Sequence, residues 1–194
     1  MWAGGTLDLL DPLREGDTVT RTSRITDIRM KHGRTGALCF VTVRHDLATE
    51  RGPALRERHD IVYRPAATAP APQPVPDARG DADAEWRVAV DPVMLFRYSA
   101  LTFNGHRIHY DDPYAREVEF YPGLVIHGPL QASLMLNLAT ARGGGLPRRF
   151  VFRGLSPACG PQTRRIRAWQ AGDGVELATV TAAGVTAMTA SAEW

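Results

Sequence analysis

Three polar side chains and a glycine before an apolar run have the types and spacing needed for acid–base chemistry. Asn104, His106 and His109 lie in the segment FNGHRIHY, and Gly128 stands where the apolar run begins. An imidazole exchanges protons near neutral pH, and N–H groups at a helix start stabilise negative charge that develops on oxygen. This combination predicts an enzyme that acts on a carbonyl compound.

His109 is the predicted catalytic base, and we expect Asp111 or Asp112 to orient its ring, as carboxylates do at other catalytic histidines. Asn104 either positions water or substrate through its amide, or only forms a turn with the glycine that follows it. His106 is either a second acid–base group or a hydrogen-bonding neighbour. The sequence leaves both alternatives open.

Gly128 is the predicted oxyanion-binding residue. Glycine lets a substrate approach the backbone closely, and Pro129 suits the first turn of a helix because it has no N–H to satisfy there. The Gly128 N–H would then donate to a carbonyl oxygen, aided by the positive end of the helix dipole. The alternative is an ordinary helix start, with His127 in a structural role.

The three histidines of this region can also be interpreted as metal ligands. Zinc requires three or four converging ligands, and His106, His109 and His127 are accompanied by no cysteine pair or HExxH pattern. We therefore predict no metal site.

Composition narrows the class of protein. A chain of 194 residues fits one ordinary domain or two small units that share a core. The formal net charge is only +2 and no long basic run appears, which argues against nucleic-acid binding. Cys39 and Cys159 lack metal spacing and are expected to be reduced thiols. No signal peptide or transmembrane run is recognised, so we expect a cytoplasmic protein without membrane contact.

The chain divides into three parts. Residues 1–64 contain strand-like segments at 18–28, 37–45 and 58–64, with a hairpin turn at 31–36 and Gly52-Pro53 in a loop. Residues 65–85 are rich in Pro and Ala and then acidic, which predicts a flexible linker. Residues 86–194 contain a predicted short helix at 112–117, a longer helix at 128–142 and strands at about 148–153, 163–170, 175–182 and 184–191.

The 128–142 helix has few polar positions, so we expect it to be buried nearly all round, with Gly143-Gly144-Gly145 ending it. One buried helix followed by consecutive antiparallel strands predicts an α+β hot-dog fold, in which a sheet wraps around the helix. The first part offers similar strands without a helix. This favours a double hot-dog arrangement with a shortened N-terminal half.

Two motifs resemble the MaoC-like, R-specific enoyl-thioester hydratases. YSALTFNGHRIHYDDPYA is similar to the hydratase motif, and YPGLVIHGPLQASLML to the helix-opening motif, of the branch that contains type 2 hydroxyacyl-thioester dehydratases and mesaconyl-CoA or itaconyl-CoA hydratases. MWAGG, PLREGD, KHGRTGALCFVTVRH and DIVYR resemble that branch's N-terminal half. The resemblance implies a partial N-terminal hot-dog half at 1–64 and a catalytic half at 86–194.

The resemblance implies a hydratase or dehydratase that interconverts an α,β-unsaturated and a 3-hydroxyacyl thioester of coenzyme A or acyl carrier protein. His109, Asn104 and His106 would be catalytic, Gly128 would bind the thioester oxygen, and no cofactor beyond the substrate's own carrier is needed. The broad family motif begins with Asp, where this chain has Asn104. Because of this difference, two alternatives to the hydratase function stay open: a hot-dog thioesterase and a non-catalytic partner subunit.

Two further expectations concern binding. Five arginines are candidates for the phosphates of coenzyme A, because arginine forms bidentate phosphate contacts: Arg107, Arg148, Arg149, Arg164 and Arg165. In the first half, Cys39, Val41 and Val43 share one strand face while Leu38, Phe40 and Thr42 share the other. Both faces are largely apolar, so we expect a homodimer or a helix-bearing partner to cover them.

Overall fold

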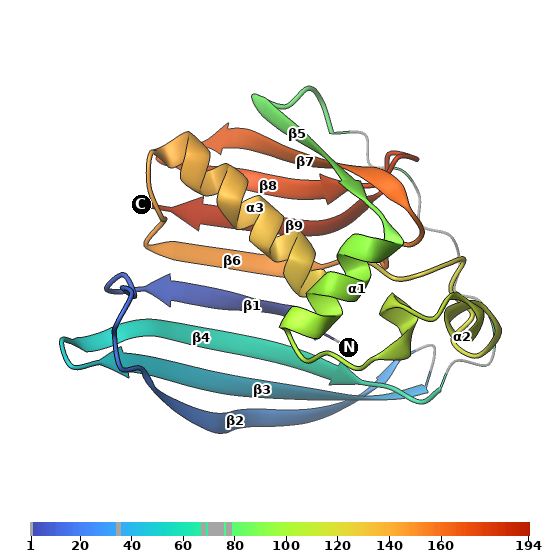
Figure 1. Cartoon of the computed structure of the whole chain (residues 1–194), viewed down its shortest axis with the longest axis horizontal. Helices are drawn as coiled ribbons and strands as arrows, with labels where there is room; N and C mark the ends of the chain where they lie inside the picture. Colours follow the sequence, from blue (N-terminus) through green and yellow to red (C-terminus); the bar gives the residue numbers. More distant parts are fainter. Residues whose placement is uncertain (1, 34–35, 67–68, 70–75, 77–78) are drawn as a thin grey trace.

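One antiparallel sheet of nine strands frames the molecule in the computed structural model, which describes residues 2–33, 36–66, 69, 76 and 79–194 (Figure 1). The strand order is β2-β3-β4-β1-β6-β9-β8-β7-β5. The strands are β1 (Trp2–Leu9), β2 (Thr20–Gly33), β3 (Gly36–Thr49), β4 (Gly52–Tyr63), β5 (Ala84–Val90), β6 (Arg149–Gly154), β7 (Gln162–Ala171), β8 (Gly174–Val180) and β9 (Thr186–Glu193). Pairing of β1 with β6 joins the two halves of the chain into this single sheet.

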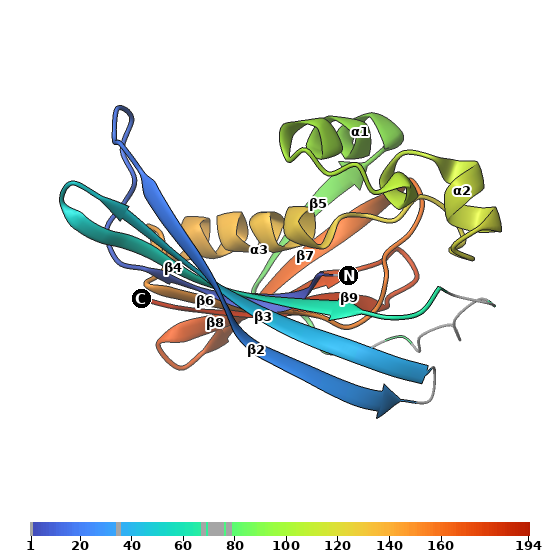
Figure 2. The same cartoon turned by 90° about the horizontal axis from the view of Figure 1, so that it is seen from below.

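The helical segments all lie on one side of the sheet, which we call the inner face (Figure 2). They are α1 (Pro92–Leu101), the 3₁₀ turn η1 (Arg107–His109), α2 (Asp112–Glu117) and α3 (Gly128–Gly143). None of these described helices has the length and apolar character that a membrane crossing requires.

Helix α3 forms the centre of the core. Met135 and Leu138 of α3 pack with Phe150 and Phe152 of β6 and with Leu177 of β8, all at most 4% exposed. The helix ends as predicted, because Gly144 adopts a left-handed conformation (φ 70°) that favours glycine. The helix is not buried all round, however.

The outer side of α3 carries polar residues that solvent reaches. Ser133 and Asn137 are exposed there, four residues apart and therefore on one helix face. The expectation of burial nearly all round is thus wrong for this side, because the helix packs on a sheet from one direction only.

In the described part of the chain, no helix lies over β2, β3 and β4 (Figure 1). Leu7 of β1 packs against the α3 core, which identifies its side of the sheet as the inner face. By strand alternation and register, Val41, Val43 and Ile28 share this face, and Ile28 is 61% exposed. The sheet around α3 confirms the α+β hot-dog fold. The double arrangement and its shortened N-terminal half remain predictions.

The structure corrects the predicted boundaries of the linker. Strand β5 begins at Ala84, inside the predicted 65–85 segment. Trp169 and Arg167 of β7 donate hydrogen bonds to the carbonyls of Asp81 and Gly80, so this end of the segment is packed. Composition did not indicate this, because backbone carbonyls make the contacts. Residues 67–68, 70–75 and 77–78 of the linker, and 34–35 of the predicted hairpin turn, lie outside the described residues.

Three other elements differ from expectation. Strand β1 and helix α1 were not predicted, and β4 starts at Gly52 rather than after a loop. The α1 signal was present, since Asp91 accepts a hydrogen bond from the Met94 N–H and Pro92 occupies the first turn. Strand β1 is paired on both sides, so tertiary pairing decides its state.

Candidate active site

His109 has the geometry of a neutral general base. Its side chain is 7% exposed, and its Nδ1 lies 2.7 Å from the carbonyl oxygen of Val125. A carbonyl only accepts hydrogen bonds, so the proton is on Nδ1 and the lone pair of the neutral ring is on Nε2. The backbone of Val125 therefore sets the tautomer of His109 and leaves Nε2 as the proton acceptor.

The ring of His109 stacks on that of His127. Their centroids are 3.7 Å apart and their planes differ by 18°. His127 is 1% exposed and its Nε2 lies 2.9 Å from the hydroxyl oxygen of Ser99, a buried residue of α1. Helix α1, absent from the sequence prediction, thus anchors the ring against which the predicted base rests.

Burial keeps both imidazoles uncharged. Desolvation lowers the pKa of His127 from its ordinary value of 6.5 to about 3, and the neighbouring His109 adds to this effect. Desolvation also lowers the pKa of His109, and the nearby His106 acts in the same direction. The hydrogen bond to Val125 opposes that decrease. At neutral pH, His109 is therefore an uncharged base, and the His127 ring stacked on it is uncharged as well.

Asn104 forms the turn that the alternative interpretation expected. Its side-chain oxygen accepts a hydrogen bond from the His106 N–H at 3.0 Å, as in an Asx-turn. No described residue forms a hydrogen bond with its side-chain nitrogen, so the amide can still donate. His106 is about half exposed, and its ring lies edge-on to His109 with 5.8 Å between centroids. Its Nε2 is 3.9 Å from a carboxylate oxygen of Glu119.

The aspartates expected to orient His109 have other partners. Asp111 caps α2 by accepting from the Tyr114 N–H, and it forms an ion pair with Arg107 at 2.7 Å. Asp112 pairs with Arg116 on α2. The prediction that Asp111 or Asp112 orients the ring is wrong, because adjacency in the chain does not bring their carboxylates to Nδ1.

Gly128 opens α3 directly after the stacked His127, as predicted. The first N–H groups of a helix have no partner within the helix and face the end where His109 lies. A further reason for glycine comes from packing, since a Cβ here would lie 2.7 Å from Cε3 of Trp2. Trp2 itself stacks on Phe152 with 4.6 Å between ring centroids. The sequence prediction expected a substrate to approach the Gly128 backbone closely. In the structure, the indole ring of Trp2 makes a close approach to it.

The three histidines do not form a metal-like cluster. His109 and His127 stack face to face, so their nitrogens lie in parallel planes, and two of them already bond to Val125 and Ser99. Across the part of the chain that the structure describes, no group of three or more His, Cys, Asp or Glu is arranged to hold a metal ion.

A buried polar network under the first turn of α3 was missed by the sequence reasoning. The Gln131 side-chain oxygen accepts from Arg164 at 3.0 Å and from the Thr179 hydroxyl at 2.7 Å. Gln131 also donates to the Ile126 carbonyl at 3.4 Å, just ahead of His127. The sequence signal for this network was Arg164, a charged residue at an inward-facing position of the predicted 163–170 strand. The alternation of side chains along a strand could have identified it.

The arginines considered for phosphate binding have diverse surroundings. Arg164 is fully enclosed, so the prediction that it contacts a phosphate of coenzyme A at the surface is wrong. Arg107 and Arg149 pair with Asp111 and Asp8. Arg165 lies 4.0 Å from Glu85. The structure leaves phosphate recognition unassigned.

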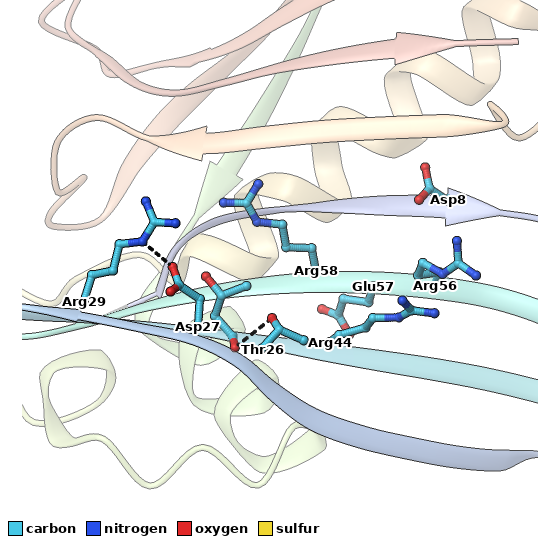
Figure 3. Close-up of a pocket in the computed structure, with 9 residues that line it drawn as sticks. Asp8, Thr26, Asp27, Arg29, Arg44, Arg56, Glu57 and Arg58 are labelled. Atoms are coloured by element: carbon cyan, nitrogen blue, oxygen red, sulfur yellow. Dashed lines mark hydrogen bonds and ion pairs between the residues drawn. The ribbon is translucent and has the colours of Figure 1, made fainter.

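A cavity of about 350 Å³ lies over the strands of the first half (Figure 3). Asp8 lines it and follows Leu7, which points to the α3 core, so the cavity is on the outer face. Arg29 and Arg58 in its wall pair with Asp27 and Asp60. Its lining residues are Asp8, Thr26, Asp27, Arg29, Thr42, Arg44, Arg56, Glu57 and Arg58, none of which belongs to the predicted site.

Comparison with known proteins adds independent evidence. The family model for hydroxyacyl-thioester dehydratase type 2 matches residues 1–160. The chain is 43% identical over 195 aligned residues to a mesaconyl-C(4)-CoA hydratase of Chloroflexus aurantiacus, covering all of this chain and 69% of that protein. It is 44% identical over 84 residues to the mitochondrial hydroxyacyl-thioester dehydratase type 2 of Schizosaccharomyces pombe, covering 42% of this chain and 28% of that protein.

Solved structures agree on the fold. The crystal structure of HtdX from Mycobacterium tuberculosis superposes with a TM-score of 0.78 at 20% identity, covering all of this chain and 74% of that one. The match to the family model spans most of the sequence and includes Asn104, His106, His109, His127 and Gly128. The chain therefore belongs to the hydroxyacyl-thioester dehydratase type 2 family.

Proposed function

We propose that this chain is a hydro-lyase that interconverts an α,β-unsaturated acyl thioester of coenzyme A or acyl carrier protein and its 3-hydroxyacyl thioester. The observation that carries the proposal is the tautomer of His109, whose Nε2 lone pair accepts no hydrogen bond from the described residues and lies beside the N-terminus of α3. Membership of a family named for thioester dehydration supports the same reaction.

In the hydration direction, His109 Nε2 takes a proton from water while the water oxygen bonds to the β-carbon. The electron pair of the α,β double bond shifts toward the carbonyl, and the Gly128 N–H stabilises the charge on the thioester oxygen. The α-carbon then takes up a proton, either the one held by His109 or one from His106, which is then replaced by the proton that His109 took from water. The Asn104 amide positions the water. This scheme uses no metal or redox cofactor.

A hot-dog thioesterase is the second candidate, since Glu119 places a carboxylate 3.9 Å from the His106 ring. A thioesterase needs a carboxylate that attacks or activates water. The other nearby carboxylates, Asp111 and Asp112, are neutralised by Arg107 and Arg116. The His109 tautomer and membership of a family named for thioester dehydration favour the hydratase.

One assay separates the alternatives. Incubation with crotonyl-CoA and with mesaconyl-C4-CoA, followed by enoyl absorbance and free-thiol titration, should show loss of the enoyl band without thiol release. Thiol release would identify a thioesterase. No reaction with any of a panel of enoyl thioesters would identify a non-catalytic subunit.

We also propose that a second chain, either a copy of this one or a helix-bearing partner, covers the inner face of β2–β4. Ile25, Ile28 and Met30 on β2 are each more than 60% exposed. Apolar groups repeated along one strand face are typical of an interface.

Both Cys39 and Cys159 are unpaired thiols, which supports a cytoplasmic setting.

A further inference from the structure

A β-bulge in β1 places Trp2 beside the first turn of α3. The pairing of β1 with β4 shifts register between Trp2 and Gly4, so Ala3 is an extra residue in this strand. In a regular strand, Trp2 and Gly4 would share the outer face, because side chains alternate with a period of two. The shift turns the Trp2 side chain to the inner face instead. Figure 1 shows the start of β1 beside the first turn of α3.

Packing against β6 holds the indole of Trp2 in this position. The indole stacks on the ring of Phe152, with 4.6 Å between centroids and 25° between planes. A Cβ on Gly5 would lie 2.8 Å from Cζ of Phe152, so glycine leaves room for that ring over β1. Trp2 also packs against the core cluster around α3. The segment WAGG at the start of β1 therefore seats one large aromatic side chain on the inner face.

The indole of Trp2 bridges the start of α3 and the inner face of β4. Its six-membered ring lies at Gly128, where a Cβ would be 2.7 Å from Cε3 and 3.3 Å from Cζ3 of the indole. The ring of His59 on β4 meets the same indole edge-on, with 6.0 Å between centroids and 73° between planes. Trp2 thus contacts both the predicted oxyanion-binding residue and a strand of the first half.

We propose that Trp2 is a specificity-determining residue, whose indole limits the length of the acyl group that the site accepts. This inference rests on the proposed function, in which the Gly128 N–H binds the thioester oxygen. The acyl chain begins at the carbon that carries this oxygen, only about 1.2 Å away from it. Because the indole lies directly against Gly128, an acyl chain that runs toward the first half meets the indole after a few carbons.

The surroundings of Gly128 leave the first half as the direction in which an acyl chain can lengthen. Toward the second half, Met188 of β9 is 2% exposed and its Cε lies 3.5 Å from the Cβ position of Gly128, so the packed core closes that direction. Toward the first half, Val43 and Ile61 share the inner face with His59, and no described helix covers them. This apolar surface suits a longer alkyl chain, and the indole of Trp2 stands in front of it.

The test compares two enoyl thioesters that differ only in length, crotonyl-CoA and trans-2-octenoyl-CoA. The measured quantity is the ratio of kcat/KM for the octenoyl to that for the crotonyl thioester. We expect the wild type to prefer crotonyl-CoA. Trp2→Ala should raise the ratio by about 10-fold or more, since a single methylene in an apolar pocket changes discrimination by about 10–200-fold.

Trp194→Ala is the matched control. The indole of Trp194 packs against Gly143, the last residue of α3, much as Trp2 packs against Gly128 at the first. The control therefore removes the same side chain from the opposite end of the same helix. Trp194→Ala should leave the ratio unchanged.

Use of a ratio cancels any effect of the substitution on the shared machinery. If Trp2 only packs against the core, Trp2→Ala will change both kcat/KM values equally, and that result would overturn the proposal. A wild type without preference for crotonyl-CoA would overturn it as well. A wild type inactive toward every enoyl thioester would instead remove the proposed function itself. Should Trp2→Ala fail to fold, Trp2→Leu keeps a smaller apolar side chain at this position, and the ratio should still rise.

Discussion

The imidazole of His109 rests flat against that of His127, with 3.7 Å between ring centroids and 18° between planes. The two residues are 18 positions apart in the chain and lie on different elements, η1 and the approach to α3. Val125 fixes the proton of one ring and Ser99 holds the other. The stack thereby links the predicted base to the helix start that would bind the oxyanion.

His109→Asn isolates the role of the base. Asparagine can still donate to the Val125 carbonyl but has no counterpart of the Nε2 lone pair. We expect kcat for enoyl-thioester hydration to fall by at least about 100-fold, since positioned acid–base groups typically contribute 10²–10⁴. His32→Asn, at an exposed position of β2, is the control and should be near normal. Near-normal turnover of a folded His109→Asn protein would remove His109 from the mechanism.

The pH profile should report the lowered pKa of His109. Only the neutral ring can take a proton, so a pKa below 6.5 places the acid limb of kcat/KM below pH 6.5. His106 lowers this pKa, and His106→Gln removes its charge. We therefore expect His106→Gln to move the acid limb to higher pH. A shift to lower pH, or an acid limb above 6.5 in the wild type, would contradict the assignment.

Stability should depend on pH through His127. Its pKa is about 3 when folded and near 6.5 when unfolded, so below pH 6.5 the unfolded state binds the extra proton. The stabilisation is complete above pH 6.5 and declines toward pH 3, by up to about 1.4 kcal/mol per pH unit. His127→Gln cannot be protonated and should flatten this slope. Urea unfolding at pH 7 and pH 5 measures it, and an unchanged slope would show that His127 is accessible to water.

Gly128→Ala should act through Trp2. The added methyl group would meet the indole at 2.7 Å, so we expect a destabilisation of about 1–3 kcal/mol from overpacking. In a Trp2→Leu background the same substitution should cost much less, which gives a coupling energy in a double-mutant cycle. If the two effects simply add, the glycine is required for a reason other than the indole, such as substrate approach.

The apolar inner face of β2 can be tested by association. Ile28→Asn places an amide on the face predicted to be covered, while Lys31→Asn alters the opposite face of the same strand. Light scattering of the wild type should show a dimer or, with its partner, a complex. Ile28→Asn should weaken that assembly and Lys31→Asn should not. A monodisperse wild-type monomer with full activity would show that no second chain is needed.

Local patterns in the sequence were sufficient for much of the second half. The strands β6 to β9, the short helix α2 and both ends of α3 follow from apolar periodicity and from Pro129 and Gly144 at the helix termini. These signals act over a few residues and need no partner. Strand β1 and the start of β5 were not recognised, because their states depend on pairing with strands far away in the chain.

For the candidate site too, some properties could be predicted from the sequence and others depend on the tertiary structure. The sequence by itself determined which side chains can do chemistry, since His109 and Gly128 have that capacity wherever they lie. The tertiary structure decided their surroundings: a backbone carbonyl rather than an aspartate orients His109, and Arg164 is enclosed rather than at the surface. Burial and hydrogen-bond partners are properties of atoms brought together by long-range packing. They set tautomer, pKa and the cost of a charge, and none of these can be read from neighbouring residues alone.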